Sequence, residues 1–258
     1  MSGAALIVGG ASGIGRACAD ALLAAGWSTV VADLRPDPDD AGAICVDVRD
    51  REGVEAAVER AAESPGGLGA VVYAAGTARV TPLLEIEPGE WDLVLGVNLT
   101  GAFNVLRAAG RSLQAGGSFL AISSIDSAAP VAGLGHYCAS KAGLEALVRS
   151  AALELGPRGI RANAVLPGLV RTPLMEPALA RPGVAEAFVA QTPLRGIAAG
   201  AEVGDVVAFL VSERARWITG ASIPVDGGMA LTEHPRLLDP APERSDPQES
   251  HPQEQPTS

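Results

Sequence analysis

Tyr137 and Lys141 are the two residues whose types and spacing most clearly predict chemistry. They lie four positions apart at the start of a segment, Tyr137–Leu155, whose pattern predicts a helix, so both side chains project from one helical face. A neighbouring ammonium stabilises a phenolate and lowers its pKa from about 10, which suits the tyrosine for general acid–base chemistry on an alcohol or a ketone. The structural alternative is a core tyrosine beside a solvated lysine.

Lysine occurs only once in this chain, because 18 of the 19 basic residues are arginine. A compact ammonium can sit between a ribose and a phenol, whereas a guanidinium is bulkier, forked and differently hydrated. The composition therefore favours a functional role for Lys141 over a solvated surface position.

A glycine-rich segment follows the first predicted strand, Ala4–Gly9, and leads into a predicted helix, Gly13–Ala25. Glycine lets the backbone turn tightly and approach a pyrophosphate closely, while a helix N-terminus supplies free N–H groups and a positive dipole end. The GxxxGxG spacing at this place predicts a dinucleotide-binding turn. Its candidate cofactor-binding residues are Gly9, Ser12, Gly13, Ile14 and Gly15.

Two carboxylates follow the next predicted strands. Asp33 ends a strand, where its oxygens can accept both hydroxyls of an adenosine ribose and would repel a 2′-phosphate, so we expect NAD rather than NADP. Arg35 is the one nearby residue that favours a phosphate. Asp47 and Val48 close the third strand, where they would meet the adenine; Asp47 as a helix N-cap would look the same.

Composition restricts the class of protein. The 258 residues are 48% hydrophobic and 19% charged, which is typical of a globular, core-forming chain. A net charge of −11 and a pI of about 4.7 disfavour nucleic acid and anionic membranes as partners. We expect a small-molecule ligand, no metal site and a cytoplasmic location, since neither a signal peptide nor a transmembrane run is visible and the three cysteines form no CxxC pair.

Residues 1–232 alternate short apolar runs with longer amphipathic segments, a pattern that predicts one α/β domain with a doubly wound, Rossmann-type parallel sheet of about seven strands and helices on both faces. Residues 233–258 are rich in proline and acidic residues and predict a mobile tail, although His234–Leu238 could instead dock on a neighbouring subunit. The expected strands are Ala4–Gly9, Ser28–Asp33, Ala43–Asp47, Gly69–Ala74, Gly117–Ser123, Ile160–Leu166 and Ser222–Val225, and the expected helices are Gly13–Ala25, Arg51–Glu63, Glu90–Leu113, Tyr137–Leu155 and Glu202–Val211.

This succession of motifs, from Ala4 to about Leu231, resembles the short-chain dehydrogenase/reductase family in its group with a GxxxGxG turn and a YxxxK pair. The resemblance implies that Ser124 holds the substrate oxygen beside Tyr137 and Lys141, and that Asn98, at a helix kink, binds a water in the proton relay. It also implies cofactor contacts, including the nicotinamide loop, by Ala75, Gly76, Asn98, Tyr137, Lys141, Pro167, Gly168, Val170 and Thr172, and a C-terminal signature at Asp226–Gly228.

The chain departs from the family pattern at two places. Val8 stands where the family usually has threonine, and Tyr73-Ala74-Ala75-Gly76 replaces the usual Asn-Asn-Ala-Gly. The connection from Asp33 to Asp47 is also too short for the helix that often joins those strands. These changes affect local rigidity more than activity.

The resulting hypothesis is an NAD-dependent oxidoreductase that moves a hydride between nicotinamide and a secondary alcohol or ketone. The apolar segment Pro173–Ala190, with Arg181 as its only basic residue, predicts a lid over a neutral, fairly apolar small molecule, or else a segment packed on the core or a subunit. His136 and Asp126 could face the substrate, although strand-end turns carry such residues for structural reasons too.

Three other functions stay open at this stage. Two are enzymatic: a 3-oxoacyl-(acyl-carrier-protein) reductase and a 2,3-dihydro-2,3-dihydroxybenzoate-like dihydrodiol dehydrogenase. The third is an NAD-sensing protein without turnover, which intact Ser124, Tyr137 and Lys141 disfavour. The resemblance further implies a homotetramer, or a homodimer, built through the helices Glu90–Leu113 and Tyr137–Leu155 and the C-terminal strand.

Overall fold

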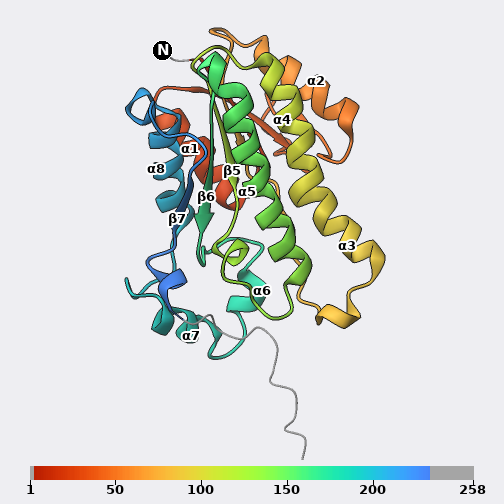
Figure 1. The fold of residues 1–258 in the computed structure, drawn as a ribbon, viewed down its shortest axis with the longest axis vertical. Coiled ribbons are helices and arrows are strands. Elements are labelled where there is room, and N and C mark those ends of the chain that lie inside the picture. Colours follow the sequence, from red (N-terminus) through yellow and green to blue (C-terminus); the bar gives the residue numbers. More distant parts are fainter. Residues whose placement is uncertain (1–2, 233–258) are drawn as a thin grey trace, which may run out of the picture.

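A seven-stranded parallel sheet, in the order β3-β2-β1-β4-β5-β6-β7, forms the centre of the computed structural model, which describes residues 3–232 (Figure 1). Most of its strands are nearly continuous apolar runs, as a parallel sheet covered on both faces requires. The sequence-based prediction of the fold is confirmed, and the predicted tail lies outside the described residues. The strands are β1 Ala4–Val8, β2 Ser28–Asp33, β3 Ile44–Cys45, β4 Leu68–Tyr73, β5 Ser118–Ile122, β6 Arg161–Pro167 and β7 Ser222–Val225.

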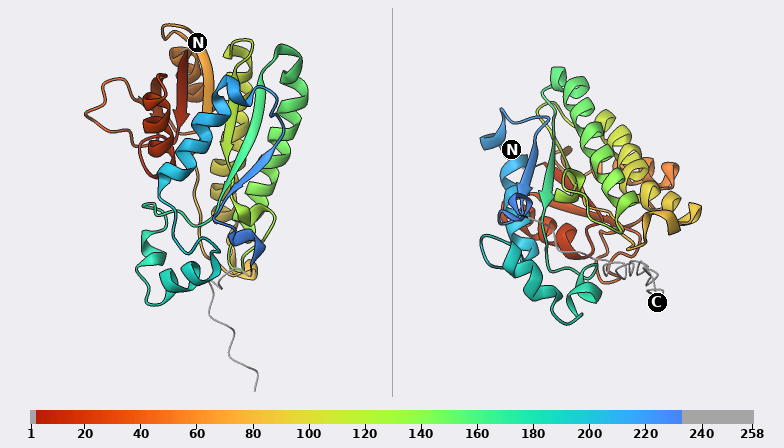
Figure 2. Two further views of the ribbon diagram at one scale, coloured as in Figure 1. Left: turned by 90° about the vertical axis from the view of Figure 1, so that its left-hand side faces the viewer. Right: turned by 60° about the horizontal axis from the view of Figure 1, so that its bottom comes forward.

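Helices cover both faces of this sheet (Figures 1 and 2). On one face α1 and α8 pack together over an apolar cluster, and on the other α2, α4 and α5 pack over a second cluster. The two layers bury the strands from both sides. The α-helices are α1 Gly13–Ala24, α2 Arg51–Ala62, α3 Pro88–Leu95, α4 Gly101–Ser112, α5 Gly135–Leu155, α6 Glu176–Leu179, α7 Val184–Gln191 and α8 Gly200–Val211.

Three local details differ from the predicted elements. β3 has only two residues, and, as expected, no helix connects β2 to β3. α5 begins two residues earlier than predicted, which places Tyr137 in its first turn. The predicted lid segment contains two short helices, α6 and α7, that the sequence pattern did not indicate.

The predicted helix Glu90–Leu113 contains a stretch of π-helix in the structure. α3 and α4 are joined without a break by a π-helical turn, Gly96–Thr100, with Asn98 at its centre. The continuous run Pro88–Ser112 is apolar and long enough to cross a membrane by length and composition, but half of that stretch is buried inside the described fold, as in a core helix. Because π-turns are rare and concentrate at functional positions, this turn marks the helix as part of the site.

Arg161 at the start of β6 connects the sheet to the end of α8. Its buried guanidinium donates hydrogen bonds to the carbonyl oxygens of Leu210, Val211 and Ser212. These are terminal carbonyls of α8, which have no partner within the helix and lie at the negative end of its dipole. The interaction holds the strand that leads to the cavity described below.

Replacing Arg161 with alanine is therefore expected to lower the free energy of unfolding by about 2 kcal/mol or more, because several buried carbonyls lose a charged donor. Denaturant unfolding, followed by circular dichroism, measures this effect. The exposed Arg111→Ala variant is the matched control and should change stability by less than about 0.5 kcal/mol. Equal stabilities of the two variants would contradict the capping role.

Candidate active site

One large cavity, of about 790 Å³, lies at the carboxyl ends of the strands around β1 and β4, where the order of the strands reverses. Doubly wound sheets bind ligands at this switch point. All of the predicted site residues line it except Asn98: the wall includes Gly9, Ser12, Gly13, Ile14, Gly15, Asp33, Asp47, Val48, Ala75, Gly76, Ser124, Tyr137, Lys141, Pro167, Gly168, Val170 and Thr172.

The glycine turn has no room for side chains. Gly9 and Gly13 adopt φ values of +82° and +53°, in the region that disfavours other residues. A Cβ on Gly15 would lie 2.0 Å from the carbonyl oxygen of Gly9, and one on Gly9 would lie 2.4 Å from the backbone nitrogen of Ala75. The bare backbone of the turn therefore faces the cavity directly.

The N-terminus of α1 ends at this turn and keeps its donors available. Ser12 is the N-cap residue, yet its side chain accepts no capping hydrogen bond, and the first turn carries no acidic residue. Free N–H groups and the positive end of the helix dipole favour an anion here. Together with the glycine cradle, this arrangement fits the pyrophosphate of a dinucleotide, so Gly9, Gly13 and Gly15 would hold that part of the cofactor.

Asp33 connects the end of β2 to the glycine turn. Its Oδ2 accepts the backbone N–H of Ala11 at 3.1 Å, and its Oδ1 accepts that of Arg35 at 3.0 Å. These two bonds hold a negative charge at the cavity wall, beside the turn. The carboxylate is thus more than an ordinary loop acid, since it orders the residues that would surround an adenosine ribose.

Asp47 and Val48 lie next to this region. Asp47 is not the N-cap of α2, because Asp50 takes that position and accepts the N–H of Glu52. The carboxylate of Asp47 instead pairs with Arg49, with 2.6 Å between Oδ2 and Nη2, and this hydrogen bond holds its pKa below the ordinary value. The helix-cap alternative for Asp47 is therefore wrong.

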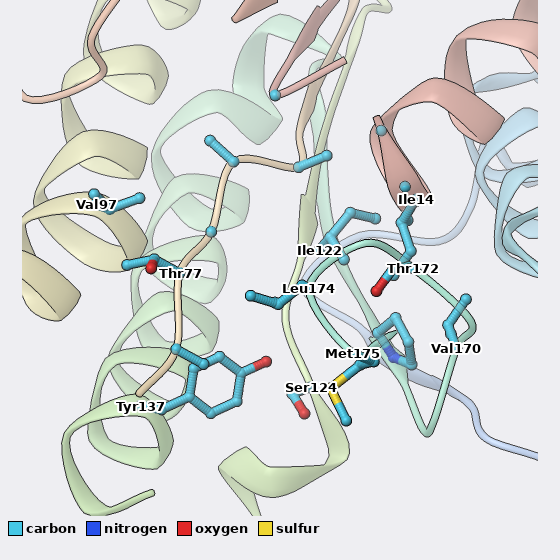
Figure 3. Close-up of a pocket in the computed structure, with 18 of the residues that line it drawn as sticks. Ile14, Thr77, Val97, Ile122, Ser124, Tyr137, Val170, Thr172, Leu174 and Met175 are labelled. Atoms are coloured by element: carbon cyan, nitrogen blue, oxygen red, sulfur yellow. The ribbon is translucent and has the colours of Figure 1, made fainter. Parts of the chain in front are cut away.

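Three of the four predicted catalytic residues, Ser124, Tyr137 and Lys141, meet on the far side of the cavity from the glycine turn. Lys141 is almost fully buried, donates a hydrogen bond from Nζ to the carbonyl oxygen of Ile122 at 2.7 Å, and lies 5.6 Å from the centre of the Tyr137 ring. The hydroxyl of Tyr137 points across the cavity toward the segment that carries Ser124, with which it interacts (Figure 3). Tyr137, Lys141 and Ser124 thus lie together in the lining of the cavity.

Burial decides the ionisation of this pair. The pKa of Tyr137 is raised well above its ordinary value by burial and by the carboxylate of Asp126, while the hydrogen bond with Ser124 acts in the opposite direction. The expectation that Lys141 gives a low tyrosine pKa is therefore wrong for the unliganded protein. Burial lowers the pKa of Lys141 to about 8. At neutral pH the phenol keeps its proton, as a donor to a carbonyl oxygen must.

Asn98 does not line the cavity. Its side chain is fully buried in the π-turn, where Nδ2 donates to the carbonyl oxygen of Thr77 and to Oγ of Ser140, and Oδ1 accepts the N–H of Thr77 at 2.8 Å. This geometry therefore does not give Asn98 the direct cofactor contact that the sequence predicted. Asn98 instead holds the loop after β4 against α5 at Ser140, the residue next to Lys141.

Tyr73, noted in the sequence only as a departure from the family pattern, belongs to the same support. It is fully buried at the end of β4, and its phenol donates a hydrogen bond to the carbonyl oxygen of Val97 in the π-turn. Gly101 leaves space for it, because a Cβ there would lie 2.7 Å from the phenol oxygen. A tyrosine at the end of a predicted buried strand is the feature of the sequence that could have identified this supporting role.

The segment Pro173–Ala190 closes one side of the cavity, as predicted, and also packs on the core. Met175 projects toward Ser124 and Leu174 projects into the cavity (Figure 3), whereas Leu179 packs against the main apolar cluster. Asp126 lines the cavity. His136 does not: it is fully buried, with Nε2 3.0 Å from Glu90 of α3, so its predicted contact with the substrate is wrong.

Comparison with known proteins identifies relatives along almost the whole chain. A family model described as enoyl-(acyl carrier protein) reductase matches residues 9–230. The 3-oxoacyl-(acyl-carrier-protein) reductase of Staphylococcus aureus is 34% identical over 246 residues, which cover 90% of this chain and 99% of the relative. L-xylulose reductase of Bos taurus is 36% identical, over 88% of this chain and 96% of the relative.

Solved structures agree with these sequence matches. A short-chain type dehydrogenase/reductase from Mycobacterium ulcerans superimposes with a TM-score of 0.84 at 30% identity, covering 91% of this chain and 93% of that one. The structure titled gox2181 gives a TM-score of 0.83 at 32% identity, over 89% and 96% of the two chains. The similarity therefore includes both the sheet and the segments that surround the cavity.

Replacing Gly15 with alanine is expected to abolish dinucleotide binding, because the added Cβ would collide with the carbonyl of Gly9 and displace the turn. Titration of nicotinamide fluorescence measures the binding. Gly26→Ala, in a turn with open space around the glycine, is the control for glycine loss: its positive φ costs stability, but binding should persist in the folded fraction. Unchanged affinity in the Gly15 variant would contradict the cradle.

Lys141→Met should make the protein more stable at neutral pH by about 2 kcal/mol. The lowering of the lysine pKa from 10.5 to about 8 corresponds to roughly 3 kcal/mol of burial penalty, and the lost bond to Ile122 offsets about 1 kcal/mol.

The increase in unfolding free energy expected for Lys141→Met depends on pH. Between pH 8 and 10.5 the unfolded chain binds a proton at Lys141 that the folded chain lacks, so the stability of the wild type rises with pH relative to the variant. The difference in unfolding free energy should therefore be largest below pH 8 and shrink by pH 10.5. A variant less stable than wild type at pH 7 would contradict the penalty.

Proposed function

This chain belongs to the short-chain dehydrogenase/reductase family, and we propose that it transfers a hydride between NAD and a secondary alcohol or ketone with an apolar body. The family and its oxidoreductase chemistry on CH–OH groups follow from the relatives. The choice of NAD, the residue roles and the nature of the substrate are our own inferences from the cavity.

The meeting of Tyr137, Ser124 and Lys141 in the cavity that the glycine turn faces is the observation that carries this proposal. A protein that only binds a dinucleotide has no use for a buried lysine beside a phenol that faces a serine hydroxyl. This disfavours an NAD-sensing protein without turnover, and the characterised relatives named above are all reductases.

In the direction of reduction, the chain supplies orientation and a proton. Ser124 donates a hydrogen bond to the carbonyl oxygen of the substrate, which orients it toward Tyr137. The phenol of Tyr137 donates its proton to that oxygen. Lys141, whose pKa is lowered to about 8, stabilises the resulting phenolate and donates a proton back to it. A bound nicotinamide supplies the hydride. Leu174 and Met175 exclude water from the side facing Ser124.

Asp33 supports NAD over NADP. Its carboxylate is held at the cavity wall by two backbone N–H groups, so it would meet a 2′-phosphate with a fixed negative charge. Arg35 donates its backbone N–H to the same carboxylate, and its side chain also lines the cavity. Activity measured with both cofactors tests this preference directly, and a higher kcat/KM with NADPH would overturn it.

Reduction of a 3-oxoacyl thioester is the second candidate. It is favoured by the similarity to the Staphylococcus aureus reductase over nearly the full length of both chains. The net charge of −11 disfavours an acidic carrier protein as the partner, because like charges repel across an interface. A direct comparison of thioesters with simple ketones distinguishes the two candidates.

We also propose a homotetramer assembled through α4, α5 and β7. Apolar side chains are exposed on these surfaces, including Phe103 on α4, Leu153 on α5 and Trp217, which is 97% exposed before β7. Light scattering after size-exclusion chromatography measures the assembly, and a monomer would contradict the proposal.

Tyr137→Phe should reduce kcat by at least about 100-fold while leaving the affinity for NADH unchanged, because only the proton donor is lost. The chain has one other tyrosine, Tyr73, which does not line the cavity. Tyr73→Phe is thus a matched control that should lower stability yet keep most of kcat. Substantial turnover by the Tyr137 variant would refute the assignment.

Lys141→Arg is expected to lose most of its activity although it keeps the charge. The buried space beside Ile122 holds a compact ammonium, and a forked guanidinium cannot occupy it without displacing the wall. Steady-state rates with the same ketone measure this loss. Rates similar to wild type would show that the single lysine has no special role.

A further inference from the structure

The charged groups of the cavity wall are unevenly distributed. Four arginines, Lys141 and three aspartates line it in a protein whose net charge is −11. At the adenosine end, Asp47 pairs with Arg49, and Asp33 lies next to Arg35. These opposite charges leave that end close to neutral.

The end that carries Ser124 and Tyr137 has a different balance. Arg79 comes from the loop after β4, Arg181 comes from the connection between α6 and α7, and Asp126 is the one carboxylate that joins them in the wall. Within residues 3–232, neither arginine forms an ion pair. In the described part of the chain, the guanidinium of Arg79 donates a hydrogen bond to the carbonyl oxygen of Ala78, at 3.1 Å.

The positions of both arginines in the chain relate them to the substrate rather than to the dinucleotide. Arg79 follows Gly76 and Thr77, the residues that lie beside Lys141 and Asn98, so it extends the wall beyond the catalytic lysine. Arg181 belongs to the lid segment, whose Met175 projects toward Ser124 (Figure 3).

Much of the remaining lining of the cavity is apolar. It therefore suits a carbon skeleton rather than a polyol. Its members include Leu93, Val131, Leu134, Leu174, Met175 and Phe188.

We propose that the substrate is a ketone or alcohol whose apolar body ends in an anionic group, a carboxylate or a phosphate ester, bound by Arg79 and Arg181. This inference rests on the proposed function and specifies the substrate of the same site. It replaces the sequence-based expectation of a neutral molecule, which considered Arg181 alone. A guanidinium binds carboxylate and phosphate oxygens in a bidentate manner, and unpaired cations at the mouth of an apolar cleft attract anions.

Matched pairs of ketones test the proposal. The carboxylate pair is 6-oxoheptanoate and its methyl ester, and the phosphate pair is 3-oxobutanoyl coenzyme A and the neutral N-acetylcysteamine thioester of the same acyl group. In each pair the reacting carbonyl is constant. The carboxylate pair differs only in charge, and the thioester pair removes the pantoate and adenosine portions together with the phosphates, so its result is read only through the arginine double variant described next. We expect the wild type to prefer one or both anionic members by about tenfold in kcat/KM, mainly through KM.

The double variant Arg79→Gln, Arg181→Gln should lose this preference and should leave kcat for the neutral members within about twofold of wild type. Because both guanidinium groups are exposed at the rim, the preference should also weaken as NaCl is raised. Arg60→Gln, an exposed arginine on α2 outside the cavity, is the matched control and should retain the preference. The pair that responds identifies carboxylate or phosphate as the ligand.

Two results would overturn the proposal: equal use of charged and neutral members by the wild type, or a preference that survives in the double variant. A binding measurement separates this failure from failure of the proposed function. If no ketone is reduced, yet 6-oxoheptanoate or coenzyme A raises the melting temperature of the NADH-saturated wild type and not of the double variant, the anion site stands and the assigned reaction fails. If neither anion shifts the melting temperature, the anion site fails as well.

Discussion

The burial of one ammonium group is the constraint on which the site depends. Lys141 is 4% exposed and donates a hydrogen bond to the carbonyl oxygen of Ile122 at the end of β5. A buried charge lowers the free energy of unfolding, and the packing of the helices against the sheet must offset this loss. Burial of the phenol itself, together with the carboxylate of Asp126, raises the pKa of Tyr137, so this side chain keeps its proton at neutral pH.

Irregular backbone surrounds this constraint. The π-turn between α3 and α4 aims Asn98 at Thr77 and Ser140, and Tyr73 ties the turn to the sheet through Val97. The loop after β4 is thereby held between two elements that are distant from it in sequence. This loop carries both Gly76, beside Lys141, and Arg79, which lines the cavity, so the same support would serve the proposed reaction and the proposed recognition of the substrate.

The family resemblance and the comparisons agree on the chemistry but leave the substrate open. Relatives that cover nearly the whole chain differ in the molecules that their names describe, from acyl thioesters to a pentulose. In our proposal, the segments after β4 and β6 determine what the cavity presents to the substrate. In this chain they present arginines and an apolar surface.

The sequence by itself determined the sheet, the glycine turn and the pairing of Tyr137 with Lys141, because these follow from local periodicity and from spacing along one element. The tertiary structure decided the rest. The direction of the tyrosine pKa shift depends on burial, and the partners of Asn98, His136 and Tyr73 lie on other elements. Arg79 and Arg181 both line one cavity because two loops, about 100 residues apart, lie at the same edge of the sheet. Contacts between such distant segments are a property of packing, and no local pattern encodes them.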